Sequence, residues 1–294
     1  MLKILPLISH EEVFALKGGT AINFFWRDFP RLSVDIDLVY VPVQERSITF
    51  NQISDSMLSI ETRIKNIIPG VEIQRMLSSE YRTITKLIAR TKNATVKIEP
   101  NTVIRGTVFP VVKRTLCDKA EAMFEVSMDI RSLSLEDLYG GKICAALDRQ
   151  HPRDLFDIKL LLKNEGFTEG IRKAFIVYLV SHDRPMIELL EPGRLNIEKI
   201  FETEFKGMET EEEVALSDLI TAREMLIGLF KTSLTEDEKK FLLSFKGKQP
   251  DWTLLGLEGM QKLPAVKWKL HNLNKMQSEK HNKAYLKLEK YLLT

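Results

Sequence analysis

The chain has 294 residues, 44% of them hydrophobic and 29% charged, and its formal net charge at pH 7 is +2. This composition is typical of a folded globular protein and excludes a largely disordered one. A net charge this close to zero gives no general argument for nucleic acid as a partner, so any basic surface must be local.

The N-terminus lacks a signal-peptide cleavage pattern, and no apolar run approaches the length of a membrane span. The two cysteines, Cys117 and Cys144, are far apart in the sequence and form no metal-type pair. We therefore expect a cytoplasmic protein with reduced thiols and no membrane partner.

The first half of the chain mixes helical and strand-like patterns. The expected elements, in chain order, are a helix over residues 10–29 broken at Gly18-Gly19, a strand over 33–41, a helix over 48–68, a strand over 71–77, a hairpin over 81–100 with its turn at 91–93, and further β-structure over 104–112.

From Ser134 onward the pattern is helical. A start resembling a capping box at Ser134 opens one helix, His151-Pro152 interrupts it, and a second helix ends at Gly166. The remaining chain is mostly helical. This change predicts an α+β fold of two domains, a mixed sheet flanked by helices in residues 1–167 and a helical domain in residues 168–294.

Asp35 and Asp37 stand one residue apart on the strand predicted over 33–41. Side chains alternate between the two faces of a strand, so both carboxylates point the same way and repel each other. A divalent cation between them relieves this repulsion, and Mg²⁺ prefers such oxygen ligands. The alternative is a solvated face that carries two surface acids.

Gly18, Gly19 and Thr20 form a turn upstream of this pair. Backbone N–H groups in such a turn, together with the Thr20 hydroxyl, can bind a triphosphate. Ser33 shares the face of the two aspartates and is a further candidate for nucleotide binding. An ordinary turn is the alternative, but a glycine turn followed by paired strand carboxylates indicates nucleotidyl transfer.

Glu99, in the segment TVKIEPN, is the best candidate for a third metal ligand. Alternation directs Val96 and Ile98 toward the core and places Lys97 and Glu99 on the opposite face. The alternative is a surface strand with an ordinary charge pair.

Lys142, Asp154 and Asp157 lie on the two helices that follow Ser134. Lys142 comes directly after Gly140-Gly141, where little shields it, and could reach a phosphate. Asp154 and Asp157 are three residues apart and share one helix face. Ordinary surface charges are the alternative for this group.

The segment 262–290 is rich in lysine. Eight lysines stand there against only two acids, and Trp268, Tyr285 and Tyr291 lie between them. This pattern fits a surface for an RNA backbone. It fits equally well a solvated amphipathic helix whose lysine stems cover the core.

Taken together, the segments GGTAINFF, RLSVDIDL, VKIEP and SLEDLYGGKICAALDRQHPRDLFDIKLLL resemble the AbiEii/AbiGii toxin family of nucleotidyltransferases. These are the toxin halves of type IV toxin–antitoxin and phage abortive-infection systems. The resemblance covers residues 10–165 and rests on the order and spacing of several motifs. It implies a DNA polymerase β-like nucleotidyltransferase fold with a helical C-terminal part.

The resemblance also implies roles for the residues quoted above. By position, Gly19 and Thr20 match the phosphate-binding turn of the family, and Asp35 and Asp37 match its metal pair. Glu99 stands where a third strand carboxylate is expected. Lys142 matches the lysine of the third motif, and Asp154 and Asp157 match its Arg-Asp-x-x-Asp segment. Glu99 or Asp35 would accept the proton of the acceptor, and Lys142 would neutralise phosphate charge.

The implied cofactor is Mg²⁺ (or Mn²⁺), and the implied substrate is a nucleoside triphosphate. The implied partners are an RNA acceptor, with tRNA expected first, and a cognate antitoxin. Two alternatives stay open. One is transfer to a protein or a small molecule, and the other is a degenerate NTP-binding module without catalysis.

Overall fold

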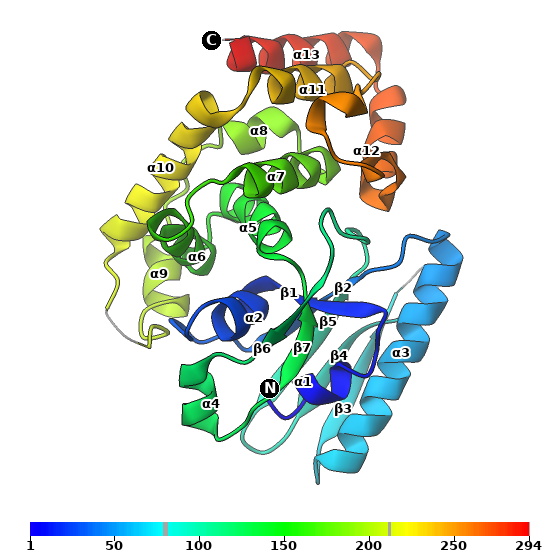
Figure 1. Cartoon of the computed structure of the whole chain (residues 1–294), viewed down its shortest axis with the longest axis vertical. Coiled ribbons are helices and arrows are strands. Elements are labelled where there is room, and N and C mark those ends of the chain that lie inside the picture. The colour runs from blue at the N-terminus through cyan, green and yellow to red at the C-terminus, as the bar shows by residue number, and fades with distance from the viewer. Residues whose placement is uncertain (79–81, 211–212, 294) are drawn as a thin grey trace. The chain divides into compact units, whose positions relative to one another are not determined.

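The computed structural model describes residues 1–78, 82–210 and 213–293 (Figure 1). The chain divides into two compact units, Met1–Ser134 and Leu135–Thr294, and each is described by itself. Helices α5 and α6, which follow Ser134, therefore belong with the C-terminal helices in packing. The sequence pattern instead predicts a division after residue 167, because it assigns α5 and α6 to the catalytic core. That assignment stays a prediction.

The described residues of the first unit form a seven-stranded sheet in the order β3-β4-β5-β2-β1-β7-β6. Its strands are β1 Phe14–Lys17, β2 Asp35–Tyr40, β3 Glu72–Leu77, β4 Ile84–Arg90, β5 Thr95–Asn101, β6 Val112–Thr115 and β7 Asp129–Ser132. Strand β2 pairs with β5, and β1 with β7, in parallel, whereas the other neighbours are antiparallel. The expected mixed sheet is thus confirmed.

One face of this sheet is apolar because helix α3, Arg46–Ile67, covers it (Figure 1). The buried side chains of α3 repeat every three or four residues, as a helix packed on a sheet requires: Phe50, Ile53, Met57, Ile60 and Ile64. On β2 the alternate residues Ile36 and Leu38 are fully buried. The Tyr40 hydroxyl donates to Gln44 and contacts Gln52 of α3.

The remaining helices of this unit are short: α1 Leu5–Ile8, α2 Gly18–Ala21, the π-helix η1 Ile22–Trp26 and α4 Asp118–Phe124. Helix α2 and η1 follow β1 without a loop. They lead the chain back to β2, and α2 contacts both of these strands.

Two expected elements are wrong. The chain before Gly18 is strand β1 rather than a helix, because it pairs with β2 on one side and with β7 on the other. The expected β-structure over 104–112 reaches a strand only at Val112, where β6 begins. Gly106 has a φ of 81°, and its N–H bonds the carbonyl of Tyr40 instead of continuing a ladder. The expected hairpin forms from Ile84, and Tyr81 lies outside the described residues.

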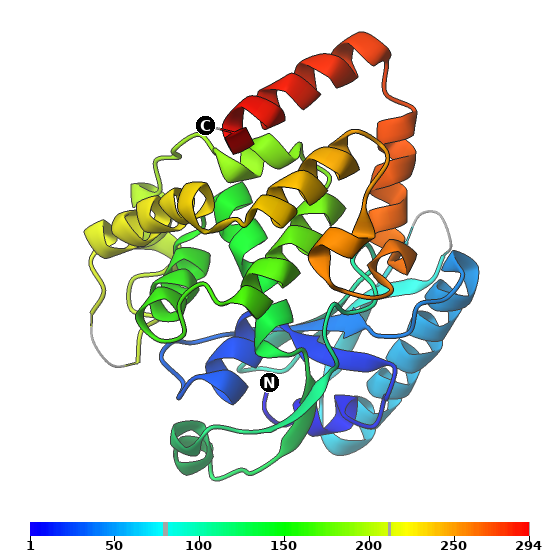
Figure 2. The same ribbon diagram turned by 45° about the horizontal axis from the view of Figure 1, so that its top comes forward.

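Helices build the described part of the second unit. They are α5 Leu135–Arg149, α6 Pro152–Lys163, α7 Glu169–Ser181, α8 Met186–Leu190, α9 Glu198–Glu204, α10 Leu216–Ser233, α11 Glu236–Lys246, the 3-10 helices η2 Trp252–Leu255 and η3 Met260–Lys262, α12 Pro264–Asn274 and α13 Ser278–Leu293. Helices α5 and α7 lie at the centre, and α7 also packs against α11 and α12 (Figure 2). No helix in the described ranges is long and apolar enough to span a membrane.

Gly140 explains how α5 and α7 approach each other so closely. A Cβ atom at Gly140 would lie 2.8 Å from the Ala174 Cβ and 2.9 Å from the backbone N of Phe175. At Gly141 the nearest atom would be in the Tyr178 ring, at an ordinary 3.7 Å. The first glycine of this pair is therefore required by helix packing, and the second is not.

We expect Gly140→Ala to lower the free energy of unfolding by about 1–3 kcal/mol, because the added methyl group meets backbone that cannot yield. Gly141→Ala is the matched control, since it adds the same group to the same helix. It should leave stability unchanged or raise it by up to about 1 kcal/mol through helix propensity. Urea unfolding followed by circular dichroism measures both, and equal stabilities would contradict the packing argument.

Candidate active site

The two aspartates lie on the face of β2 that α3 does not cover. Asp35 and Asp37 are half-buried, whereas Ile36 and Leu38 between and beyond them are fully buried on the other face. The predicted alternation is therefore observed. Burial of the apolar set holds the two carboxylates on one side in spite of their repulsion.

Glu99 stands beside Asp37 on the neighbouring strand. In the parallel pairing of β2 with β5, Asp37 is the register partner of Glu99, and Asp35 is the partner of Lys97. Paired residues point to the same face of a sheet, so Glu99 shares the face of the aspartates. Its carboxylate forms an ion pair with Lys86 of β4.

A row of four charges thus crosses the sheet through Asp37. Lys17 of β1 is the register partner of Asp37 on its other side. The order is Lys17, Asp37, Glu99 and Lys86, with the two carboxylates between the two ammonium groups. The flanking lysines offset part of the repulsion between the two acids.

The donor set suits a hard divalent cation. All three candidate ligands are carboxylates on one sheet face, which is the oxygen-rich chemistry that Mg²⁺ and Mn²⁺ prefer. Within the described ranges no three His, Cys, Asp or Glu side chains are close enough to hold one metal ion, and Glu99 contacts Lys86 instead. Asp35 and Asp37 are suited to hold a metal ion as they stand. Glu99 would become a third ligand by giving up its ion pair with Lys86.

Gly18 lies directly against the Asp37 carboxylate. A Cβ atom there would sit 2.4 Å from the Asp37 Oδ2, and the φ of Gly18 is +73°, in the region that favours glycine. At Gly19 a Cβ would lie 2.8 Å from an Arg31 Nη2 and 3.2 Å from the Ser33 Oγ. The absence of side chains at these two glycines therefore lets the Asp37 carboxylate and the Arg31 guanidinium lie directly against the backbone.

Thr20 has a structural role in the observed arrangement. Its buried hydroxyl donates to the Asp35 carbonyl at 2.5 Å and lies 3.0 Å from the Ser33 Oγ. Since a hydroxyl has one proton, the Ser33 hydroxyl is the donor to Thr20. These bonds tie the glycine turn to the start of β2, and the predicted contacts of Thr20 and Ser33 with a phosphate stay predictions.

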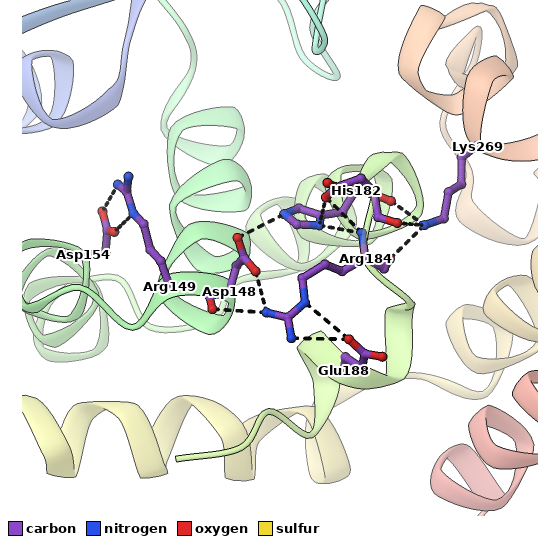
Figure 3. Close-up of polar contacts among 8 residues, drawn as sticks. Asp148, Arg149, Asp154, His182, Arg184, Glu188 and Lys269 are labelled. Carbon is purple, nitrogen blue, oxygen red and sulfur yellow. Dashed lines mark hydrogen bonds and ion pairs between the residues drawn. The ribbon is translucent and has the colours of Figure 1, made fainter. Parts of the chain in front are cut away.

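Lys142, Asp154 and Asp157 meet in the second unit as a closed ion-pair cluster. The Lys142 Nζ lies 2.8 Å from Asp154 Oδ1 and 3.0 Å from Asp157 Oδ2. The Lys142 side chain is 8% exposed, and those of Asp154 and Asp157 are 1% and 0% exposed. Arg149 adds bonds of 2.6 and 3.1 Å to Asp154 (Figure 3).

The cluster is held together by desolvated charge. Burial by itself would raise the pKa of Asp154, but the ammonium of Lys142 and the guanidinium of Arg149 outweigh it and hold this pKa well below its usual value. Two cations therefore offset two carboxylates. The predicted contact of Lys142 with a phosphate stays a prediction.

The sequence pattern did not identify four cations of these sites: Lys17, Lys86, Arg31 and Arg149. Lys86 could have been found, because the register of the predicted hairpin sets it opposite Glu99. Arg31 and Arg149 meet their partners through loop geometry, for which the sequence holds no comparable signal.

The family model described as "Nucleotidyl transferase AbiEii toxin, Type IV TA system" matches residues 1–272. The chain therefore belongs to the AbiEii family of nucleotidyltransferase toxins, and it is a nucleotidyltransferase of a type IV toxin–antitoxin system. This family implies a nucleoside triphosphate substrate and an antitoxin partner.

Among solved structures, the chain is similar to MenT4, a nucleotidyltransferase toxin from Mycobacterium tuberculosis H37Rv, with a TM-score of 0.59 and 15% sequence identity. The match covers 92% of this chain and 89% of that one. At this identity the likeness shows a shared fold. No curated protein sequence matches the chain.

We expect Lys142→Met to lower the free energy of unfolding by about 3–5 kcal/mol, because it leaves two buried carboxylates with one cation fewer. The matched control is Lys159→Met on α6, where the pair with Asp218 is partly exposed and removal should cost no more than about 1 kcal/mol. Denaturant unfolding measures both variants, and equal stabilities would show that the cluster is not a stabilising unit.

The pH dependence of stability provides a second check on this cluster. A carboxyl whose folded pKa is depressed adds stability above its unfolded pKa of about 4, and this stability is lost as the pH falls toward the folded pKa. Arg149→Gln removes one of the cations that depress the pKa of Asp154. The variant should be less stable than the wild type at pH 7. Because the unfolded pKa is common to both proteins, the difference in stability should narrow only as the pH falls through the folded pKa that Asp154 has in the variant. A gap independent of pH would refute this account.

Proposed function

We propose that this toxin is a Mg²⁺-dependent (or Mn²⁺-dependent) enzyme that transfers a nucleoside monophosphate from a nucleoside triphosphate to an RNA acceptor, with tRNA as the first acceptor to test. The observation that supports this most is the placement of Asp35, Asp37 and Glu99 on one sheet face beside the Gly18-Gly19 turn. We further propose that the protein acts in the cytoplasm.

Asp35, Asp37 and Glu99 are the residues that would hold the metal. Bound there, a divalent cation would lower the pKa of an acceptor hydroxyl and offset charge on the triphosphate. The residues of this chain supply the rest. Glu99 or Asp35 would accept the proton of the acceptor, and the backbone of the Gly18-Gly19 turn would bind a phosphate close to Asp37.

Thr20 and Ser33 serve this site by fixing the turn to the start of β2, since their hydroxyls bond to each other and the Thr20 hydroxyl also donates to the Asp35 carbonyl. Lys142, Asp154 and Asp157 contribute in a different way. Their mutual pairing fixes the junction of α5 and α6, and contact of Lys142 with a β- or γ-phosphate requires it to exchange one carboxylate partner.

The test incubates the purified full chain with Mg²⁺, each labelled nucleoside triphosphate in turn and total bacterial RNA. The wild type should label a band of tRNA size. Asp37→Asn should lower the rate of labelling by about 10³-fold or more, because the metal supplies several kcal/mol of transition-state stabilisation. Its control is Asp55→Asn, an exposed aspartate on α3, which packs on the other face of the same sheet.

Each outcome separates the candidate acceptors. A label on protein or on a small molecule would overturn the RNA assignment and leave nucleotidyl transfer in place. Absence of any label, with nucleotide still bound, would favour the non-catalytic alternative. Equal activity of Asp37→Asn and Asp55→Asn would overturn the metal assignment.

A further inference from the structure

Helix α12 presents a polar and aromatic face to solvent. Its apolar residues Ala265, Val266 and Leu273 are buried in the second unit. Four exposed residues share one face of the helix, because His271 stands three or four residues from each of the others: Lys267, Trp268, His271 and Lys275, which follows the last turn. We call these four residues the α12 platform.

Trp268 is the centre of the platform. Its side chain is 58% exposed, and its ring stacks on that of His271, with 5.6 Å between centroids and 25° between planes. A single exposed apolar residue is ordinary, but two stacked rings in solvent offer a flat π-surface. The other aromatics of this segment are used internally, since Tyr285 is half-buried and Tyr291 donates to the Leu190 carbonyl.

The segment that carries Trp268 is cationic. Residues 259–278 contain four lysines and neither aspartate nor glutamate. Of these lysines, Lys262, Lys267 and Lys275 are exposed. No ion pair joins any of the three to a described residue, whereas Lys283 on α13 bonds Glu279 at 2.6 Å.

The fourth lysine holds the helix in place. The Lys269 Nζ donates to the carbonyl oxygens of His182, Asp183 and Arg184 at 2.5, 3.0 and 2.8 Å, just beyond the end of α7 (Figure 3). Burial, together with nearby Lys246, lowers the pKa of Lys269 to about 8, so it is cationic at neutral pH. This anchor fixes the rotation of α12 and keeps Trp268 outward.

We propose that the α12 platform binds the RNA acceptor, with an unpaired base stacked on Trp268 and with Lys267 and Lys275 on the flanking phosphates. The inference rests on the proposed function, because it takes RNA as the acceptor. Lysine is depleted at the cores of protein interfaces, so cations around the exposed ring favour a polyanion over a protein. Stacking on a side chain requires a base that is free of its own stack, which favours single-stranded ends and loops.

The binding test uses the full chain and a fluorescein-labelled single-stranded oligoribonucleotide of about 12 nucleotides, followed by anisotropy. Trp268→Ala should weaken binding by about 5- to 100-fold, which is the usual range for loss of one base-stacking aromatic. Trp268→Phe keeps a ring and should retain most of the affinity. A duplex of the same length should bind with little dependence on Trp268.

Salt dependence tests the two lysines. Each phosphate contact on a single strand adds about 0.7 to the slope of log affinity against log salt concentration. Lys275→Gln should reduce the slope by about that amount. The matched control is Lys283→Gln, which removes an equally exposed lysine that already has an acidic partner and should leave the slope unchanged.

Unchanged RNA binding by Trp268→Ala would overturn the proposal, and so would equal losses in Trp268→Ala and Trp268→Phe with native circular dichroism. Failure of the wild type to bind RNA would also overturn the proposal. So would a Trp268→Ala variant that keeps its affinity for RNA but no longer binds a protein partner. The labelling assay separates this result from the proposed function. If RNA binding depends on Trp268 but no RNA is labelled, the α12 platform is supported and transfer to RNA is refuted. If RNA is labelled but Trp268→Ala binds RNA as the wild type does, transfer to RNA is supported and the α12 platform is refuted.

Discussion

Strand β2 is paired on both sides, antiparallel with β1 and parallel with β5, and this pairing fixes the positions of the charged residues that stand next to Asp35 and Asp37. Its apolar residues Ile36 and Leu38 are fully buried. A slip of one residue would bury Asp37 and expose those two side chains, so hydrophobic burial sets the register. Asp37 consequently stands between Lys17 and Glu99. Burial of Ile36 and Leu38 on the opposite face of β2 offsets the unfavourable repulsion between the acidic residues.

The lysines of the second unit show how burial separates structural charges from available ones. Lys142 is surrounded by two carboxylates, and Lys269 by three carbonyl oxygens, because a desolvated ammonium must have partners. Lys267 and Lys275 are exposed to water, which solvates them at no such cost. The number of lysines in a segment therefore does not show whether they are available to bind a ligand, whereas the burial and the partners of each lysine do.

Much of the fold could be predicted from periodicity. The structure contains the strand predicted within 33–41, the helix predicted over 48–68 and the two helices predicted after Ser134. Long helical patterns and strictly alternating patterns each fit only one type of secondary structure. Strand β1 could not be predicted, because a segment of four residues, three of them apolar, fits a helix as well as a strand, and only pairing with its two neighbours decides between them. Glycine is a poor residue for a helix interior, yet Gly140 permits the close crossing of α5 and α7, which only the packed structure shows.

The sequence by itself determined which residues are candidates for the chemistry and that Asp35 and Asp37 share a face. Alternation along one strand is a local property, so it placed Asp35 and Asp37 together without knowledge of the fold. Only the tertiary structure decided that Glu99 stands beside Asp37 and bonds Lys86, and that Lys142 is enclosed by two acids. These contacts join residues far apart in the chain, and their geometry follows from strand register and helix packing, which arise only when the whole unit buries its core.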